Sequence, residues 1–431
     1  MKLAKMSLVA ALLLGTSVYA IDNVKVNGDV KLFYGTQSED YNTFDTTDDG
    51  GLFEKDSSYA DAGLRLGVTA DLSEGISAGA TFLAVSTLGL ENNLVSGVWS
   101  GAHATSTSTG ASFGPDVQVD DASWFADAWI AGTMGKTTAK VGRMTLESPL
   151  VFTETWSVDY NSFEAGVLIN EDIPDTTLVG AWIGKSNGYA DDESGSNIGN
   201  LASVGGKFNT FAKDGAYMAG ITNNSIAPLT AQAWYYDLQS YSKAYWLQAD
   251  LDMEGIIAGA QYTNIGYSTA GDKDNTAYAV KLGYAIPDTV TITAAYSSVD
   301  DDAAGNSDDS ANGVVNFATN GQTAGSASSL YTEMWWWFNT VSLPGADSFA
   351  VTFEGTAAEV DLFLGLYSSD IQVAGGTTDE VDEITFTASK SFGPLDTSLA
   401  LIHDMFDTDG AKPVGYVDAL TTVQVYLTYN F

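Results

Sequence analysis

The last eleven residues of the chain, Thr421–Phe431, read TTVQVYLTYNF. Apolar and polar residues alternate along this stretch, and an alternation with a period of two is typical of a β-strand. Such a strand could border a soluble core or a lipid bilayer. The chain stops on an aromatic residue, and aromatic residues at strand ends form the interfacial girdles of transmembrane barrels. The stretch therefore predicts one strand of a membrane-spanning β-barrel. The residues on its apolar face are Val423, Val425, Leu427, Tyr429 and Phe431.

The other end of the chain has the pattern of a secretory signal peptide. Lys2 and Lys5 precede a short apolar run, and Val18–Ala20 places small residues at the positions that a signal peptidase reads. The run is too short for a transmembrane helix, which needs about 20 apolar residues. We therefore expect residues 1–20 to be a cleaved signal peptide and residues 21–431 to form a single transmembrane β-barrel domain.

Composition restricts the class of protein. The 431 residues include no cysteine, which excludes a disulfide framework and a thiolate metal site. Acidic residues number 55 and basic residues 17, so the formal charge is −38, and it becomes −40 when the two leader lysines are removed. A nucleic-acid partner, which requires a basic patch, is thereby excluded. No helix-length apolar run follows the leader, and only a closed barrel could then satisfy every backbone group in hydrocarbon.

Alternating segments recur along the whole chain. Strands of about ten residues separated by turns are the signature of a transmembrane barrel. We expect an all-β, antiparallel barrel of about 18 strands, with 16 as the alternative, and either number leaves a water-filled bore. Residues 360–367 could be a strand or a ribbon inside an external loop. The clearest segments are residues 24–34, 60–72, 76–82, 124–130, 137–141, 163–169, 229–235, 245–251, 256–262, 278–284, 290–296, 349–353 and 384–388.

The connections between these segments have two sizes. Short ones contain Gly, Pro, Asn or Asp, and long ones are polar and acidic. Short periplasmic turns and long external loops are typical of outer-membrane barrels. A soluble sandwich or solenoid with irregular insertions is the alternative, but soluble sheets rarely place Ala, Leu and Val outward on so many strands. The long connections are expected at residues 35–58, 86–120, 185–214 and 300–329.

Several short motifs resemble the OprD-type outer-membrane porins. With the leader and the YLTYNF ending, the chain is most similar to the Campylobacter-type major outer-membrane porins. The resemblance implies an 18-stranded barrel that forms a homotrimer in the outer membrane of a Gram-negative bacterium. It also implies a channel, not an enzyme, through which small hydrophilic solutes diffuse. The motifs are Gly142–Arg143, Ser148–Leu150 and Ser162–Gly166 for a strand–loop–strand unit, Ala231–Tyr236 and Gln248–Asp250 for a central hairpin, and Ser342–Gly345 before Phe349 for a late periplasmic turn.

One departure from this family affects the expected selectivity. OprD-type porins are known for a ladder of arginines that guides carboxylate substrates, but this chain has only Arg65 and Arg143. Inward lysines, expected to include Lys25, Lys31, Lys140 and Lys281, do not replace a ladder. A general, cation-preferring porin is therefore favoured. The alternative is a structural or adhesive surface barrel with acidic partner-binding loops, which the absence of a plug domain before Val24 disfavours.

A pore constriction is expected where Met144–Ser162 connects the fifth and sixth strands, because in porins a loop at this place folds into the bore. Acidic residues of the loop would face basic residues of the wall, and only charges at a narrow point act strongly, since salt screens charges over about 8 Å. Arg143 joins the wall only if a bulge near Gly142 turns it inward. The alternative is that these residues are ordinary solvated pore lining. The candidates are Glu147, Glu154 and Asp159 on the loop, and Arg65, Lys140 and Arg143 on the wall.

Other candidate sites are weaker. Ser398 and His403 could suggest a hydrolase, but their opposite strand parity places them on opposite faces of a strand. No cofactor is expected, although acidic loops at residues 45–56 or 300–302 could bind Ca²⁺ weakly. Trp335–Trp337 is expected to belong to an interfacial aromatic belt, with a stacking site in the lumen as the alternative. Outer-membrane lipid, lipopolysaccharide and the barrel-assembly machinery, through Phe431, are the expected partners.

Overall fold

The structure is a computed structural model, and it describes residues 21–38, 51–95, 97–98, 121–188, 205–212, 214–268, 273–301, 313–318, 327–373, 377–410 and 417–431. The expected signal peptide, His103, Asp302 and residues 45–50 of the expected calcium loop lie outside these ranges.

The described residues form eighteen long strands and one two-residue strand, β8. The first ten elements are β1 (Asp22–Gln37), β2 (Ser58–Ser73), β3 (Ile76–Ser86), the 3₁₀ turn η1 (Leu90–Asn92), β4 (Ala122–Met134), β5 (Thr137–Met144), β6 (Phe163–Asn170), β7 (Thr176–Ser186), β8 (Asn209–Thr210) and β9 (Ala216–Ile226). The others are β10 (Leu229–Leu238), β11 (Ser242–Met253), β12 (Ile256–Tyr267), β13 (Asn275–Ile286), β14 (Val290–Val299), η3 (Thr340–Ser342), β15 (Ala346–Ala357), β16 (Val360–Val373), β17 (Thr377–Phe392), β18 (Leu395–Thr408) and β19 (Ala419–Asn430).

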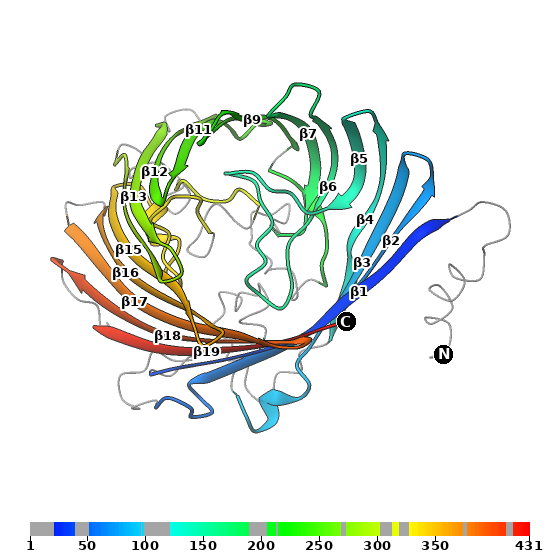
Figure 1. The fold of residues 1–431 in the computed structure, drawn as a ribbon. Coiled ribbons are helices and arrows are strands. Elements are labelled where there is room, and N and C mark those ends of the chain that lie inside the picture. Colours follow the sequence, from blue (N-terminus) through cyan, green and yellow to red (C-terminus); the bar gives the residue numbers. More distant parts are fainter. Residues whose placement is uncertain are drawn as a thin grey trace.

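The long strands pair antiparallel with their neighbours and close into a barrel (Figure 1). Closure comes from β1, which pairs with β19 as well as with β2, so that Val30 lies opposite Tyr429. The short β8 pairs only with Lys185 and Ser186 at the end of β7. The 18-stranded antiparallel barrel predicted from the alternation is confirmed, and residues 360–367 belong to the regular strand β16.

The outer faces of the long strands are mostly apolar, whereas the inner faces are mixed. On β13, Val280 is 47% exposed and faces outward, whereas Ala279 beside it is buried inside the barrel. An outer surface of exposed apolar side chains is what a lipid-facing barrel requires. None of the helices within the described residues has the length and apolar character of a membrane span.

One end of the barrel carries the two described chain ends and the tight turns. The turn between β11 and β12 has positive φ angles at Glu254 and Gly255, as expected for a two-residue hairpin. The connections at the opposite end include the long ones. Ser342–Gly345 lies there, in the connection from β14 to β15, because Gly345 donates its N–H to Asp300 directly after β14. Its assignment to a periplasmic turn was therefore wrong.

Two connections from the loop end fold into the barrel (Figure 1). We call residues 145–162, between β5 and β6, the first loop, and residues 327–345, before β15, the second loop. Their side chains join a buried apolar cluster that includes Leu150, Met334 and the wall residue Trp246. Residues 300–329 were expected to be a long external loop. The connection leaves from the loop end as expected, but its described residues 313–318 and 327–345 fold back and contribute to the buried cluster inside the bore.

Candidate pore constriction

The first loop is held against the wall by hydrogen bonds at several points. The Tyr160 hydroxyl donates to Asp127 Oδ2 on β4 at 2.6 Å, and the Ser162 hydroxyl donates to the Ala126 carbonyl at 2.6 Å. The loop also lies directly on β2, where a Cβ at Gly63 would come within 2.7 Å of the Val158 carbonyl oxygen. Glycine at position 63 therefore permits this close approach.

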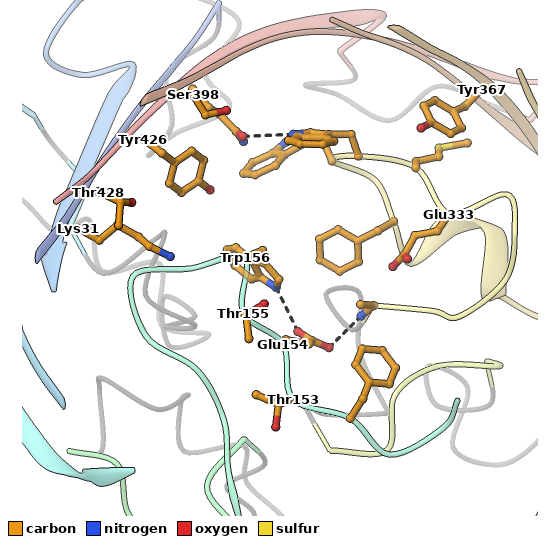
Figure 2. Close-up of a pocket in the computed structure, with 17 residues that line it drawn as sticks. Lys31, Thr153, Glu154, Thr155, Trp156, Glu333, Tyr367, Ser398, Tyr426 and Thr428 are labelled. Atoms are coloured by element: carbon orange, nitrogen blue, oxygen red, sulfur yellow. Dashed lines mark hydrogen bonds between the residues drawn. The ribbon is translucent and has the colours of Figure 1, made fainter. Parts of the chain in front are cut away.

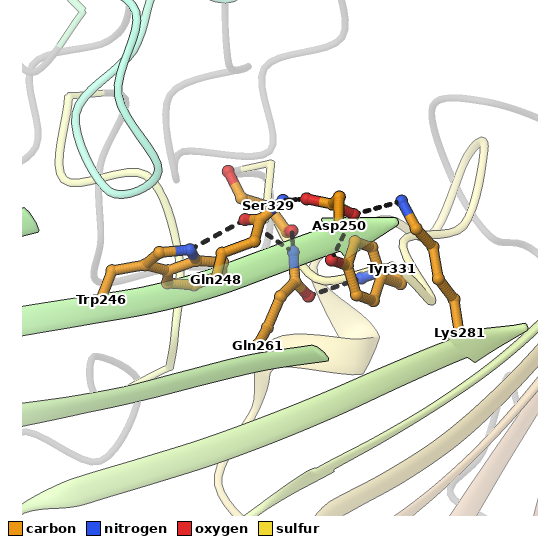
Figure 3. A network of polar contacts seen from close by, with 7 residues as sticks. All are labelled: Trp246, Gln248, Asp250, Gln261, Lys281, Ser329 and Tyr331. Atoms are coloured by element: carbon orange, nitrogen blue, oxygen red, sulfur yellow. Dashed lines mark hydrogen bonds and ion pairs between the residues drawn. The ribbon is translucent and has the colours of Figure 1, made fainter. Parts of the chain in front are cut away.

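The second loop is anchored to the wall formed by β11, β12 and β13 (Figure 3). Asp250 is the centre of this anchor, because its carboxylate accepts hydrogen bonds from the Tyr331 hydroxyl at 2.7 Å and from Gln248 Nε2 at 2.7 Å. It also forms an ion pair with Lys281 at 2.8 Å. The Lys281 ammonium lies 4.1 Å from the centre of the Tyr331 ring, a cation–π distance.

Gln261 fixes the backbone of the second loop with both ends of its amide (Figure 3). Its Nε2 donates to the Ser329 carbonyl at 2.8 Å, and its Oε1 accepts from the Tyr331 N–H at 3.1 Å. The wall residue Trp246 donates to Gln248 at 2.9 Å and completes the network. A side-chain amide that donates one hydrogen bond to the loop backbone and accepts another from it fixes the position of the loop.

The two infolded segments meet at Glu154, which is only 3% exposed. Its Oε1 accepts from Asn316 Nδ2 at 3.0 Å and from the Ala327 N–H at 3.2 Å, and its Oε2 accepts from the Trp156 indole at 3.2 Å. Asn316 also donates to the Phe152 carbonyl at 2.9 Å. The first loop and the described residues 313–318 and 327–345 of the β14–β15 connection are therefore joined inside the bore by hydrogen bonds.

A cavity of about 630 Å³ remains between the two loops and the wall formed by β1, β18 and β19 (Figure 2). Aromatic rings form much of its surface. The lining residues are Lys31, Phe152, Thr153, Glu154, Thr155, Trp156, Ala327, Glu333, Met334, Trp335, Trp336, Phe338, Tyr367, Ser398, Gln424, Tyr426 and Thr428.

Two carboxyl groups and one lysine with different environments line this cavity. Burial, together with the nearby charge of Glu154, raises the pKa of Glu333 to about 8, although the Ser328 N–H donates to its carboxyl group. Glu333 is therefore neutral at pH 7, since a desolvated carboxylate is unfavourable. Lys31 on β1 donates to the Ser157 carbonyl at 2.7 Å. Glu154 is the other carboxyl group of the cavity lining.

Of the three predicted acidic residues, the structure brings only Glu154 to the cavity. Asp159 is buried in the same loop, two residues from the Ser157 carbonyl that Lys31 contacts. Glu147 is exposed and does not line the cavity. The loop was correctly expected between the fifth and sixth strands, but the spacing of its acids along the chain did not indicate which of them would face the opening.

The basic residues that line the cavity also differ from those predicted. Arg65 faces inward, where it pairs with Asp29 at 2.7 Å and lies 5.8 Å from the Tyr160 ring of the first loop. Lys140 faces inward as well and stacks on Trp129 at 4.4 Å. Neither residue lines the cavity. Lys31 lines the cavity. It was not predicted as a constriction residue, although the alternation along β1 predicts that its side chain points inward.

Arg143 was expected to turn inward through a bulge, and this expectation is wrong. The β4–β5 and β5–β6 ladders place Arg143 opposite Ala128 and Glu164 without a shift of register in β5. The guanidinium pairs with Glu164 at 3.0 Å, on the outward face that also carries the exposed Leu168. Arg143 therefore contributes to the outer surface of the barrel and not to the pore.

The tryptophan triplet Trp335–Trp337 lies in the lumen, so its assignment to an interfacial belt was wrong. Trp335 and Trp336 line the cavity, and all three backbone N–H groups bind Glu383 on β17. No pattern in the sequence indicated this position, because the triplet lies in a connection and not in an alternating strand. Glu333 was missed for the same reason.

The structure does not support a hydrolase site at Ser398 and His403. Ser398 lines the cavity, whereas His403 binds the Thr421 hydroxyl at 2.9 Å on the other face of β18, so they do not form a nucleophile–base pair. Within the part of the chain that the structure describes, no group of three or more His, Asp or Glu residues has a metal-binding arrangement.

Comparisons with known proteins agree with this architecture. The family model described as "outer membrane porin, OprD family" matches residues 100–376. Similar solved structures include OccAB1 of Acinetobacter baumannii, with 12% identity, a TM-score of 0.69 and coverage of 96% of this chain and 98% of that chain. OccK8 (OprE) of Pseudomonas aeruginosa has 14% identity, a TM-score of 0.66 and coverage of 95% and 98%. At these identities the likeness shows the fold. No curated protein matches the chain.

Proposed function

The chain belongs to the OprD family of outer membrane porins, and we propose that its diffusion channel prefers cations and runs through the cavity beside Glu154. The family establishes an outer-membrane channel for small solutes that is not an enzyme. The observation that carries the proposal is the position of Glu154, a carboxylate at the narrow point between two infolded loops.

The charge distribution supports this preference. The formal charge of the chain is −38, and the long acidic connections would concentrate cations near the loop end. Salt screens such charges over about 8 Å, whereas a charge at a confined passage acts directly on each passing ion. The hydrogen bonds described for Glu154 come from uncharged donors, which are the Trp156 indole, the Asn316 amide and the Ala327 N–H. Lys31 opposes this charge and should moderate the preference without reversing it.

We expect a gradient of potassium chloride across a bilayer to give a reversal potential of cation-selective sign. Glu154→Gln should shrink this potential even at 1 M salt, where the screening length is about 3 Å, because the amide keeps a similar size and removes the charge. Glu147→Gln is the matched control, since Glu147 belongs to the same loop but is exposed and does not line the cavity. It should affect the potential only at low salt. Preference of the native channel for chloride would refute the proposal, and equal effects of the two variants would refute the role of Glu154.

We further propose that the barrel is a homotrimer in contact with lipopolysaccharide and lipid. The outer surface has a groove of about 630 Å³ across β4 to β9, to which Ile130, Leu168 and Trp182 contribute exposed apolar surface. A second copy packed on this groove would bury these side chains. Leu168→Cys should then cross-link adjacent copies in outer-membrane vesicles, whereas Leu282→Cys, on the exposed surface of β13, should not. Cross-linking at both positions or at neither would contradict the proposed interface.

We also propose that the barrel-assembly machinery recognises Phe431 and that residues 1–20 direct export. Phe431 is 55% exposed and is tied to Gly28 by two backbone hydrogen bonds of 2.9 Å. Deletion of Phe431 should lower the amount of heat-modifiable barrel in the outer membrane several-fold. Phe392→Ala, which removes an exposed aromatic residue from the same end of the barrel, serves as the control. Unchanged assembly without Phe431 would contradict its role.

A further inference from the structure

Glu383 lies on β17 and is 0% exposed. Its carboxylate accepts four hydrogen bonds, and three of them come from consecutive backbone N–H groups of the second loop. The donors are the N–H groups of Trp335 at 2.8 Å, Trp336 at 2.8 Å and Trp337 at 3.0 Å, and the Thr385 hydroxyl at 2.7 Å.

Successive backbone N–H groups that point to one place form a concave anion-binding nest. Here the anion is a side chain of the wall, so the nest fastens the loop to β17. Hydrogen bonds to an ionised acceptor are about twice as strong as neutral ones. An uncharged amide offers a single acceptor oxygen and two N–H donors, so it cannot replace a carboxylate that accepts from both of its oxygens.

The contact with Glu383 affects the opening because it holds Trp335, whose ring occupies part of the bore. Its ring is 40% exposed, lines the cavity, and lies 6.0 Å from the ring of Phe363 on β16. Its indole N–H donates to Gln424 on β19 at 3.4 Å. Glu383 therefore holds the backbone of a residue whose ring extends along the wall from β16 to β19 and occupies space in the bore.

We propose that Glu383 is the positioning residue that sets the width of the passage, by holding Trp335–Trp337 across the lumen. The inference rests on the proposed passage but not on its ion preference. The second loop is attached to the wall by the Asp250 network on β11–β13, by a hydrogen bond between the Thr332 and Ser297 hydroxyls at β14, and by Glu383 on β17. Without Glu383, the segment that carries Trp335 keeps the first two attachments and loses the third, and it moves away from the β16–β19 wall.

The test compares Glu383→Gln with the native channel in single-channel recordings and in liposome swelling with neutral sugars of increasing size. Conductance should rise about twofold and larger sugars should enter, because pore diameter governs both quantities. Glu354→Gln is the matched control, since Glu354 is an exposed acid on the lumenal side of β15 and its replacement removes the same charge. Its sugar cut-off should stay native.

Several outcomes would overturn the inference. If Glu383→Gln and Glu354→Gln give the same sugar cut-off, Glu383 does not position the loop. A native protein that conducts no ions and passes no sugars would instead refute the proposed passage. The temperature at which the folded barrel loses its gel mobility should stay within a few degrees of native for Glu383→Gln, because the change loosens a loop and leaves the strand ladders intact.

Trp335→Ala provides a second route to the same conclusion if Glu383→Gln assembles poorly. It keeps the backbone N–H that binds Glu383 and removes only the ring, so it should also raise the sugar cut-off. An unchanged cut-off in Trp335→Ala would overturn the inference. When Glu383→Gln and Trp335→Ala are combined, the increase in sugar cut-off should not exceed the larger of the two single increases, because both changes act on the same ring.

Discussion

Replacement of Val280 by arginine is expected to destabilise the barrel by about 2–4 kcal/mol, the cost of a cation on the lipid face near the bilayer midplane. Val280 lies near the middle of β13, faces outward, and pairs with Ala260 and Tyr296 on the adjacent strands. Its neighbours on this face offer no carboxylate at the paired positions. Reversible urea unfolding in lipid vesicles, followed by tryptophan fluorescence, measures the difference directly.

Thr291→Arg is the control for this prediction. Thr291 lies on β14 and faces the lumen, where it pairs with Glu354 on β15, so an arginine there has water and a carboxylate nearby. It should change the free energy of unfolding by less than about 1 kcal/mol, as expected for an exposed ion pair. Equal losses for the two variants would show that Val280 does not contact lipid.

Glu154→Ala should separate the two infolded loops and give the largest change in permeability. The change removes an acceptor of the Asn316 amide, the Ala327 N–H and the Trp156 indole. Asn316 is fully buried, and a buried donor that loses its acceptor costs about 1–3 kcal/mol, which weakens the docking of the loops at this point. Conductance should rise, and the discrimination between small and large neutral sugars should weaken.

Glu154→Gln separates the effect of the lost hydrogen bonds between the loops from the effect of the lost charge. The amide keeps one acceptor oxygen for Asn316 and Ala327, which link the two infolded segments, and loses only the acceptor of the Trp156 indole, a residue that is 36% exposed. The sugar cut-off should therefore stay near native while the ion preference falls. The prediction fails if Glu154→Ala retains the native cut-off, because the contact at Glu154 would then be dispensable for the crossing of the loops. Identical behaviour of the Ala and Gln variants would show that only the charge matters.

The strand architecture could be predicted because a period of two is a local property. Alternation such as that of Val423, Val425 and Leu427 fixes which face of a strand is apolar, whatever the partner strand. The antiparallel barrel and the inward direction of Lys31 and Arg65 follow from this local pattern, which left 16 strands as an alternative to 18. The same rule predicts that Arg143 shares the outward face of Val141, and the ladder register shows that no bulge reverses it.

The constriction could not be predicted in the same way, because it depends on contacts between residues far apart in the chain. Glu154 and Asn316 are 162 residues apart, and Glu383 binds amides 46 to 48 residues before it. The sequence by itself determined the closed sheet, since each strand carries its own face pattern. Only the tertiary structure decided that the second loop enters the bore, that Trp335 faces the passage, and that Glu154 and Lys31 line it. The physical reason is that a connection has no repeating pattern, so its position is set by the donors and acceptors that the closed barrel presents to it.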